Sequence, residues 1–482
     1  MSKALISGLI LLFCSPIFYI FYKFGISINF LSLNGLTWAL KNTLMQGVLT
    51  SLLGIFLGVV LSWGLFRARP SILPLLRTLC YIPLMLPSIF SVLVALNLLP
   101  FFPYGHWGVI FIYLLIYTGY CTFFVFDTTQ KKIQNMGFLS EVYNLKQVDF
   151  IFKIYLPLIK SELFALGIFI FSCTATSLTV PMMAGGGRGT NLEVFLYEKI
   201  YIDAAWSAAA VVLMIHLIAM LILSLFVRNA DSSSDNQDRY ILNKYLGSKT
   251  SLVLLMACVG VYLLPISVKL LIAAFEIEWS EAFVKELIFS IQGSIAVFMG
   301  SSLLFLAFIY LMGYLHYMKA QVSYLRGFQN ISAVVVGFAS LIFWSKKITF
   351  LSYFSLLYCM AFIYFLSLYF SFFDPILKKM NNQFFTAQVY NIKYRSIFRT
   401  VIWPQIAEVY SWSLGLLGLI SLMDFVYVYV SGATYQTLGT LFENYLTSYR
   451  MSYALVIALV AIFLWMGLYF LLRLAYVDHK KS

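Results

Sequence analysis

Side chains that could support catalysis are few in this sequence, and they form no recognisable constellation. The four histidines lie far apart, at positions 106, 216, 316 and 479. The six cysteines show neither pair spacing nor metal-ligand spacing, so we expect them to be small buried hydrophobic residues. The sequence contains no G-x-x-x-x-G-K-[ST] phosphate loop. We therefore predict that the chain is not an enzyme, holds no metal or cofactor of its own and does not hydrolyse ATP.

Two basic segments carry the most informative spacing. VYNLKQVDFIFKIYLP runs from Val142 to Pro157, and VYNIKYRSIFRTVIWP runs from Val389 to Pro404. In each copy an Asn precedes a Pro by 13 residues, and the two copies lie 247 residues apart. The candidate residues between these ends are Leu145, Lys146, Phe150 and Lys153 in the first copy, and Ile392, Lys393, Arg395 and Phe398 in the second.

The ends of both segments suggest the same local geometry. Asn144 and Asn391 suit the left-handed conformation that ends a helix. Pro157 and Pro404 suit the start of the next membrane helix, where a missing N–H costs nothing. We therefore predict a sharp helix–turn–helix with a projecting basic helix in each copy. Ordinary basic loops lying on anionic lipid would explain the charge, but not the duplicated spacing.

A second group of candidates comes from apolar stretches. Asp424 is the best carboxylate within one of them, and it could line the route of a cationic substrate or be a hydrogen-bonded packing residue. Gly185, Gly186 and Gly187 permit irregular backbone, which is tolerated at membrane depth only where protein or a cavity shields it. These glycines could form a gate, a contact for a binding protein, or a plain turn.

The composition shows what surrounds these residues. Of the 482 residues, 62% are hydrophobic and only 11% are charged, with a mean hydropathy of +0.89. A soluble domain cannot bury that much apolar surface, so most of the chain must contact lipid. The formal net charge of +13 is attributed to basic cytoplasmic loops, and nucleic-acid binding is not expected.

Uncharged runs long enough to cross a bilayer predict about twelve transmembrane helices. A crossing needs about 20 apolar residues. The run 78–126 is long enough for two crossings and is broken at 100–105, and the region 405–431 provides one more. The other runs are 4–22, 42–66, 163–187, 204–227, 250–268, 287–318, 327–345, 348–373 and 451–472. The first run lacks a small-residue cleavage site and is expected to be a retained helix.

The predicted helices divide into two parallel repeats of six. The offset of about 247 residues carries Ser177 to Asp424 and Gly185 to Gly432, so the echo extends beyond the basic loops. The fold class is therefore an all-α polytopic membrane protein with two six-helix halves. Residues 1–228 form the first half, 229–250 a polar cytoplasmic linker, and 251–482 the second half. Both basic segments and both termini are then cytoplasmic, and the acidic loop 276–286 lies outside.

The two loops resemble the cytoplasmic loop of permease subunits of ATP-binding-cassette importers. That family motif contains Glu-Ala-Ala, then Gly, and ends in Leu-Pro. Here Asn144 and Asn391 occupy the Gly position, and Leu156-Pro157 and Trp403-Pro404 occupy the end. Phe138-Leu-Ser and Phe385-Thr-Ala replace Glu-Ala-Ala. The resemblance implies that Leu145–Phe152 and Ile392–Arg399 are coupling helices that dock in two copies of a cytoplasmic ATPase, which would bind the ATP and Mg²⁺.

The resemblance also suggests a class of substrate. The segment from Gly185 to Tyr197 is similar to one found in fused permeases for thiamine and for iron(III). Leu422–Phe425 and the segment ending in Ser448-Tyr-Arg450 are closer to the thiamine type. Such importers imply an extracytoplasmic solute-binding protein and a bacterial cytoplasmic membrane. We expect thiamine or a related cation, with iron(III) as the alternative.

A secondary transporter with two six-helix halves is the main rival, because it would also be a parallel repeat. Its signature basic loop lies between the second and third helices of each half. In this sequence the patterned loop lies between the predicted fourth and fifth helices, twice, which favours the ATP-driven permease.

Overall fold

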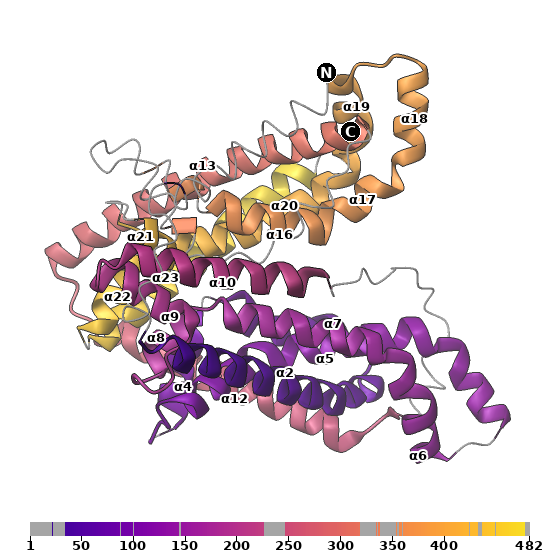
Figure 1. Cartoon of the computed structure of the whole chain (residues 1–482), viewed down its shortest axis with the longest axis horizontal. Coiled ribbons are helices and arrows are strands. Elements are labelled where there is room, and N and C mark those ends of the chain that lie inside the picture. Colours follow the sequence, from indigo (N-terminus) through magenta and orange to yellow (C-terminus); the bar gives the residue numbers. More distant parts are fainter. Residues whose placement is uncertain are drawn as a thin grey trace. The chain divides into compact units, whose positions relative to one another are not determined.

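The computed structural model describes residues 34–86, 88–99, 101–143, 146–225, 246–318, 360–423, 425–431, 436–448 and 450–477, together with residues 22, 334, 336, 337, 353 and 356–358. These residues are almost entirely helical and include no strand (Figure 1). They form two compact units. The α2 unit contains Asn34–Phe195 and Ile222–Val268, and the α13 unit contains Leu196–Leu221 and Lys269–Ser482.

The α2 unit is built around one long helix, α2 (Leu36–Arg67), which packs against α5 and α7. Its other elements are α3 (Leu73–Met85), α4 (Ser88–Leu98), α5 (His106–Val142), α6 (Gln147–Asp149), the π-helix η2 (Phe150–Tyr155), α7 (Leu156–Ala175), α8 (Thr179–Ala184) and the start of α9 (Leu192–Tyr197). The first part of α12 (Lys249–Glu276) also belongs to this unit.

Small and polar residues let the helices of the α2 unit approach closely. The buried stripe of α2 includes Asn42, Gly47, Ser51, Gly54 and Gly58, which recur at helical spacing. A Cβ at Gly58 would lie 2.6 Å from Cβ of Cys121 on α5. Membrane helices use such residues because lipid supplies no hydrophobic drive for association, so close packing and hydrogen bonds must do it.

Helix α12 packs equally closely, although it follows the predicted linker in sequence. A Cβ at Gly64 would overlap the backbone nitrogen of Leu252. The N–H of Ser248 donates to the carbonyl oxygen of Trp63 at 3.2 Å, and the hydroxyls of Ser91 and Tyr262 are 2.9 Å apart. The two compact units therefore do not coincide with the two halves predicted from the sequence, because the first part of α12 packs in the α2 unit.

The α13 unit is built around α13 (Glu281–Tyr317) and α20 (Trp403–Met423), which pack together. Its other elements are α10 (Trp206–Leu225), α16 (Leu366–Leu368), α17 (Asp374–Lys379), α18 (Asn381–Val389), α19 (Tyr394–Ile397), α21 (Val426–Ser431), α22 (Leu438–Thr447) and α23 (Met451–Val477), with the π-helices η3 (Glu198–Ile202), η5 (Ala361–Phe365), η6 (Tyr369–Phe373) and η7 (Phe398–Ile402). Aromatic rings fill its core. Phe305 lies 4.9 Å from Phe365 and 5.9 Å from Tyr410, measured between ring centroids.

Seven described helices are long and apolar enough to cross a membrane, so the chain is a multi-pass α-helical membrane protein. The pair α3 and α4 would add an eighth span, but the two helices are bent by 92° at their junction. The predicted turn at 100–105 is confirmed, since α5 begins directly after Gly105, whose φ is +107°. The predicted spans at 4–22 and 327–345 lie outside the described residues, except for positions 22, 334, 336 and 337. Twelve spans and the two repeats stay predictions.

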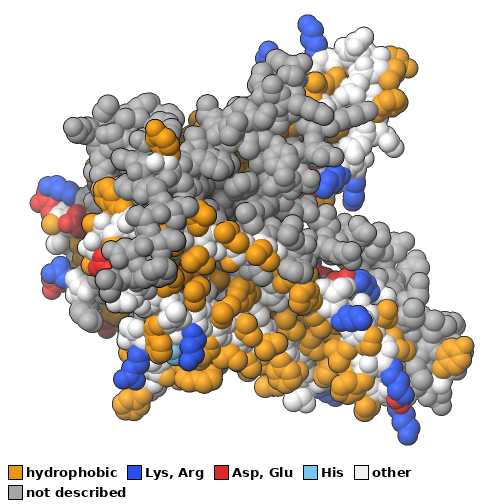
Figure 2. All heavy atoms as spheres, viewed as in Figure 1, with side chains coloured by type: hydrophobic (Ala, Val, Ile, Leu, Met, Phe, Trp, Pro, Cys, Tyr) orange, Lys and Arg blue, Asp and Glu red, His pale blue; other side chains and the backbone are white. Residues whose placement is uncertain are grey.

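The outer surface of the candidate spans is apolar, as contact with lipid requires. Large exposed hydrophobic side chains on α2 include Leu44, Leu52 and Phe56, and those on α12 include Val253 and Leu264. On the face drawn in Figure 2, hydrophobic side chains cover the middle of the α2 unit, and Lys and Arg side chains lie toward its ends. That distribution is expected where hydrocarbon surrounds the middle of the helices and water their ends.

The close contact of α3 with α5 leads to a stability prediction. A Cβ at Gly119 would overlap the carbonyl oxygen of Cys80, so Gly119→Ala must push the two backbones apart. We expect it to destabilise the protein by about 1–3 kcal/mol, the usual cost of overpacking. Thermal unfolding of the detergent-solubilised chain would measure the change. Gly467→Ala is the matched control, because no atom lies within 4 Å of its added methyl. Equal unfolding temperatures for the two variants would contradict the prediction.

Candidate functional site

The second basic loop turns sharply where the sequence predicts it. Helix α18 ends at Val389, and Asn391 has a φ of +50°, in the left-handed region. The N–H of Ile392 donates to the carbonyl oxygen of Ala387 at 2.9 Å, and the N–H of Asn391 to that of Gln388 at 3.1 Å. This is the Schellman arrangement, which satisfies the last carbonyl groups of a helix. The left-handed conformation predicted for Asn391 is confirmed.

Hydrogen bonds tie this turn to the end of α13 (Figure 1). The amide of Gln388 donates to the carbonyl oxygen of Tyr317, and the Tyr317 hydroxyl donates to that of Ile392 at 3.2 Å. The Tyr394 hydroxyl reaches back to the carbonyl oxygen of Tyr310 at 2.9 Å. This approach needs Gly313, where a Cβ would lie 2.5 Å from the Tyr394 oxygen. Residues before and after the turn are therefore both hydrogen-bonded to α13.

The outward side of the second loop is basic with apolar patches. Lys393, Arg395 and Arg399 are exposed, while Tyr394 and Ile397 between them are buried. Val389, Tyr390 and Ile392 are also exposed, the second of these to 73%. The loop thus presents cations beside exposed hydrophobic side chains.

The first loop is described only in part, because Asn144 and Leu145 lie outside the described residues. Lys146 and Lys153 are exposed, and the Lys153 ammonium lies 2.6 Å from the Asp149 carboxylate. Phe150 is buried while Phe152 is 66% exposed. Exposed basic residues thus lie beside buried apolar ones in the first copy as well.

Pro157 and Pro404 lie at the starts of α7 and α20, as predicted, but no break in the helical backbone precedes either helix. Gln147–Ala175 is one continuous helical run, and so is Tyr394–Met423. In each run a π-helix comes just before the proline: η2 ends at Tyr155, two residues before Pro157, and η7 ends at Ile402, two before Pro404. A proline lacks the N–H and clashes with the carbonyl four residues back, so an α-helix cannot pass it unchanged. The π-helix inserts the extra residue that absorbs this defect.

A buried ionic cluster supports α17, the helix before the second loop. Asp374 is 2% exposed, and its carboxylate lies 3.3 Å from His316 Nε2 and 2.6 Å from Lys378 Nζ. Burial acts to raise the pKa of Asp374, but the neighbouring His316 and the hydrogen bond from Lys378 outweigh it and hold the pKa below its ordinary value. The charged carboxylate therefore ties the end of α13 to the start of α17.

The glycine segment of the α2 unit is held by amide side chains. Gly186 and Gly187 have φ values of +49° and +73°, which non-glycine residues rarely adopt. The Asn42 amide donates to the carbonyl oxygen of Thr190 at 2.8 Å, and the Gln46 amide donates to that of Gly189 at 2.8 Å. Gly185 is buried, whereas Gly186 and Gly187 are exposed. The segment is thus an ordered turn whose buried side is satisfied by α2.

Short helices following the apolar runs are anchored alike in the two units. The N–H of Leu192 donates to Thr43 Oγ1 at 2.8 Å, and that of Leu438 donates to Ser294 Oγ at 2.9 Å. Asn191 caps α9 through the N–H of Val194, and Thr437 caps α22 through the N–H of Thr440. A hydroxyl on a long helix therefore receives the first free N–H of a capped short helix in both places.

Sequence reasoning missed a buried carboxylate on α22. Asp424 lies outside the described residues. Glu443 on α22 is 9% exposed, and Tyr429 donates to its Oε2 at 2.9 Å. Burial raises the pKa of Glu443, although the Tyr429 hydrogen bond opposes the rise. The signal available in the sequence was Thr437-x-x-Thr440, a helix-capping pattern that begins an amphipathic helix.

Known proteins give no further assignment. The chain matches no protein-family model, no curated protein and no solved structure. Within the ranges that the structure describes, no group of three His, Cys, Asp or Glu side chains could hold a metal ion.

The left-handed residue of the second loop can be tested by substitution. Asn391→Val places a β-branched residue at a φ of +50°, and we expect it to cost about 1–2 kcal/mol, while Asn391→Gly should leave stability unchanged or raise it. Asn382→Val is the control, because Asn382 is exposed inside α18 and the two residue types have similar helix propensity. Unfolding midpoints in detergent would show the difference. If Asn391→Val unfolds like the control, the turn does not require this conformation.

The ionic cluster predicts a dependence on pH. The pKa of Asp374 is lowered on folding, so its contribution to stability is present above the ordinary carboxyl pKa of 3.8 and is lost as the pH falls through the folded-state value. Asp374→Asn should therefore destabilise the protein by about 1–3 kcal/mol at pH 7. The gap from the parent protein should narrow below about pH 3.8.

Unfolding midpoints at pH 7 and pH 3 would measure this gap. Glu281→Gln is the control, because that side chain is 85% exposed and forms only a surface ion pair with Lys285. A gap for Asp374→Asn that stays constant with pH would show that the charge of Asp374 does not stabilise the fold.

Proposed function

We propose that this chain is the permease subunit of an ATP-driven importer, with thiamine or a related organic cation as its cargo. The chain would form the path across a bacterial cytoplasmic membrane, with both termini on the cytoplasmic side. Two copies of a separate ATPase would bind the two basic loops from the cytoplasm. A solute-binding protein would deliver the cargo from the other side.

One observation supports this proposal: the basic loop occurs twice with the same spacing from Asn to Pro. In both copies a π-helix lies just before the proline, and exposed basic residues are interspersed with buried apolar ones. Sequence drift would not keep two irregular segments alike unless both did the same work. Two equivalent docking sites are what a pair of identical ATPase subunits requires.

The anchoring of the short helices is consistent with a duplicated architecture. Thr43 and Ser294 each accept the first free N–H of a capped helix, and these helices begin at Leu192 and Leu438. The same construction thus recurs far apart in the sequence. It supports the proposal that two halves of the chain share one plan.

The second loop could transmit movement of a bound partner to α13 and α20, because it is joined rigidly to both helices. A protein that grips Lys393, Arg395 and the exposed Ile392 pulls on a turn whose hydrogen bonds lead directly to Tyr310 and Tyr317 on α13. The same helical run continues without a break into α20. Movement of the partner would therefore shift whole membrane helices instead of bending a flexible loop. Alternating access by rocking of the two halves follows from such coupling.

Energy would come from the partner, because ATP binding and hydrolysis occur on the ATPase subunits. ATP binding would draw the two subunits together, and each would carry its loop with it. The path would then open toward the binding protein. Gly186 and Gly187, exposed on an otherwise tightly held turn, are the proposed contact or gate on that side.

Co-purification is the experiment that tests this function. Tagged chain is isolated in mild detergent from its own host, and bound proteins are identified by mass spectrometry and assayed for ATPase activity. We expect an ATPase that carries a phosphate loop to co-purify. It should be lost when Asn144 and Asn391 are both changed to Val and when 145–152 and 392–399 are scrambled.

The matched control changes the acidic loop that is predicted to lie on the opposite face. Glu278→Gln with Glu281→Gln should retain the ATPase, since neither residue belongs to a basic loop. Gel filtration establishes that each variant remains folded. An intact parent chain that brings down no ATPase would exclude the importer and leave the secondary transporter as the better proposal.

A further inference from the structure

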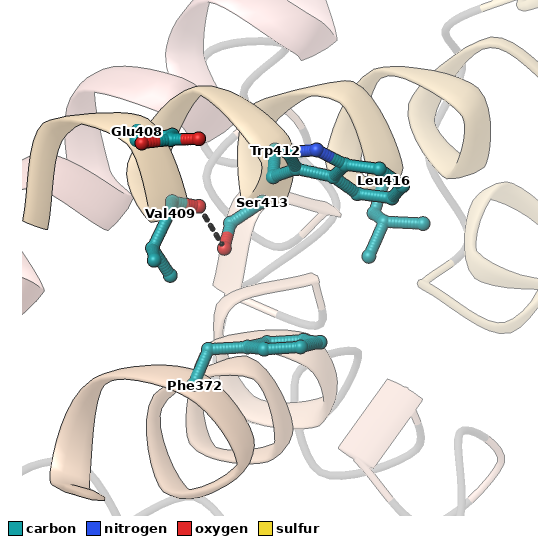
Figure 3. A pocket seen from close by; sticks show the side chains of 6 residues that line it. All are labelled: Phe372, Glu408, Val409, Trp412, Ser413 and Leu416. Carbon is teal, nitrogen blue, oxygen red and sulfur yellow. Dashed lines mark hydrogen bonds between the residues drawn. The ribbon is translucent and has the colours of Figure 1, made fainter. Parts of the chain in front are cut away.

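A cavity of about 180 Å³ beside α20 is a gap in apolar packing and not a polar site. Phe372 of η6 lies across it from that helix, as Figure 3 shows. The Ser413 hydroxyl in its wall already donates to the carbonyl oxygen of Val409 at 2.9 Å, and Glu408 is an exposed side chain. Polar groups without partners gather instead in the α2 unit, around the glycine segment, residues 185–190.

The backbone of the glycine segment leaves consecutive N–H groups free. Gly185 has a right-handed conformation, with φ −72° and ψ −21°, and the φ values of Gly186 and Gly187 are positive. Among the described residues, no group accepts a hydrogen bond from the N–H of Gly186, Gly187 or Arg188. A right-handed residue followed by a left-handed one turns successive N–H groups toward one side, and such a backbone nest binds anions.

Neighbouring elements hold this backbone in place through its carbonyl groups. On the side of α2, the Asn42 amide donates to the carbonyl oxygen of Arg188 at 3.2 Å. On the side of α5, the N–H of Gly105 donates to the carbonyl oxygen of Ala184 at 3.0 Å. Neither contact uses an N–H of the segment. The free donors are therefore fixed before any ligand arrives, which lowers the entropy cost of binding.

Three basic side chains lie around the free N–H groups. Arg188 belongs to the segment, and its Cβ lies 3.8 Å from the position of a Cβ at Gly105, the residue before His106. Lys41 directly precedes Asn42 on α2, and it lies close enough to act on the charge of His106. On the face drawn in Figure 2, a His side chain lies beside Lys or Arg side chains toward one end of the α2 unit.

No described carboxylate neutralises this group. Lys41 and Arg188 are exposed and form no ion pair with a described residue, and Nδ1 of His106 has no hydrogen-bond partner there either. Glu193 is 0% exposed, so its charge does not face the solvent. The other described carboxylates of the unit have partners elsewhere: Asp127 with Arg77, Asp149 with Lys153, and Glu162 with Lys132.

These donors and charges fit a phosphate group. A phosphate monoester carries about −1.5 to −2 charges at pH 7, which Lys41 and Arg188 together balance. Its oxygens accept several hydrogen bonds at once, so backbone N–H groups and a guanidinium can bind the same group. The planar guanidinium of Arg188 also matches two phosphate oxygens, as an ammonium group does not.

We infer that the glycine segment, with Lys41, His106 and Arg188, is a site for a phosphate monoester group. The N–H groups of Gly186 and Gly187 and the Arg188 guanidinium donate to its oxygens, and Lys41 supplies further charge. The group belongs to a water-soluble ester or to a lipid headgroup, because the candidate spans in α2 and α5 begin at this end. The inference rests on the geometry of the α2 unit and does not require the proposed import function.

Equilibrium dialysis of the full chain in a maltoside detergent, which contains no phosphate, tests the site with radiolabelled inorganic phosphate as the probe. We expect saturable binding. Arg188→Gln should weaken it at least about tenfold, because a charged multiple donor is lost. Lys41→Gln should weaken it about threefold, as an exposed charge does.

Gly187→Ala tests the backbone without changing a charge. No atom lies within 4 Å of the added methyl, but a side chain disfavours the φ of +73°. Relaxation of the turn would then disperse the N–H groups, and we expect binding to weaken about fivefold.

Two competitors identify where the phosphate group comes from. Glycerol phosphate and a short-chain phosphatidic acid both end in a phosphate monoester, but only the second has acyl chains. Displacement of the probe at much lower concentration by phosphatidic acid assigns the site to a lipid headgroup. Equal displacement, or stronger displacement by glycerol phosphate, assigns it to a water-soluble ester. Short-chain phosphatidylcholine, a diester, should not displace the probe.

Matched controls separate the site from general charge effects. Arg67→Gln and Lys160→Gln each remove one exposed charge of the same unit outside the glycine segment, and both should bind phosphate as the parent chain does. Unfolding midpoints verify that every variant remains folded. Absence of saturable phosphate binding to the folded parent chain would overturn the inference, and so would an Arg188→Gln variant that binds phosphate as tightly as Arg67→Gln.

Discussion

Hydrocarbon offers no hydrogen-bond partner, and this constraint shapes every irregular part of the protein. Each backbone N–H and C=O that leaves a helix at membrane depth needs another protein group to receive it. Thr43 and Ser294 accept the free N–H groups of two short helices, and Asn42 and Gln46 donate to the carbonyls of the glycine segment. The polar residues of the buried stripe on α2 therefore lie beside non-helical segments and satisfy the backbone groups that those segments leave without a helical partner.

The basic loops follow from the same constraint. A proline within a long helical run would leave a carbonyl unsatisfied, and the π-helices ahead of Pro157 and Pro404 take up the defect without breaking the run. The loop can then remain continuous with a membrane helix. Combined with the hydrogen bonds from the second turn to α13, this continuity joins the turn rigidly to two candidate membrane-spanning runs.

Sequence periodicity and composition could predict what depends on local chemistry. They indicated a helical membrane protein, the turn before α5 and the left-handed Asn391, because apolar runs, Pro-Gly turns and Asn caps act over a few residues. They could not predict the 92° bend between α3 and α4, the π-helices or the cluster of Asp374 with His316, since these depend on distant neighbours.

The course of α12 has a consequence for synthesis. Its first part follows the polar linker, yet it packs against Gly64 and Ser91 in the α2 unit, while Leu196–Leu221 belongs to the α13 unit. Neither unit can complete its packing from the segments that leave the ribosome first. The α2 unit is complete only when residue 268 has been made, although α2 already has α5 and α7 as partners before then. A break of the chain in the linker would consequently leave two fragments that each lack part of a core, and only their joint insertion in one membrane would restore both.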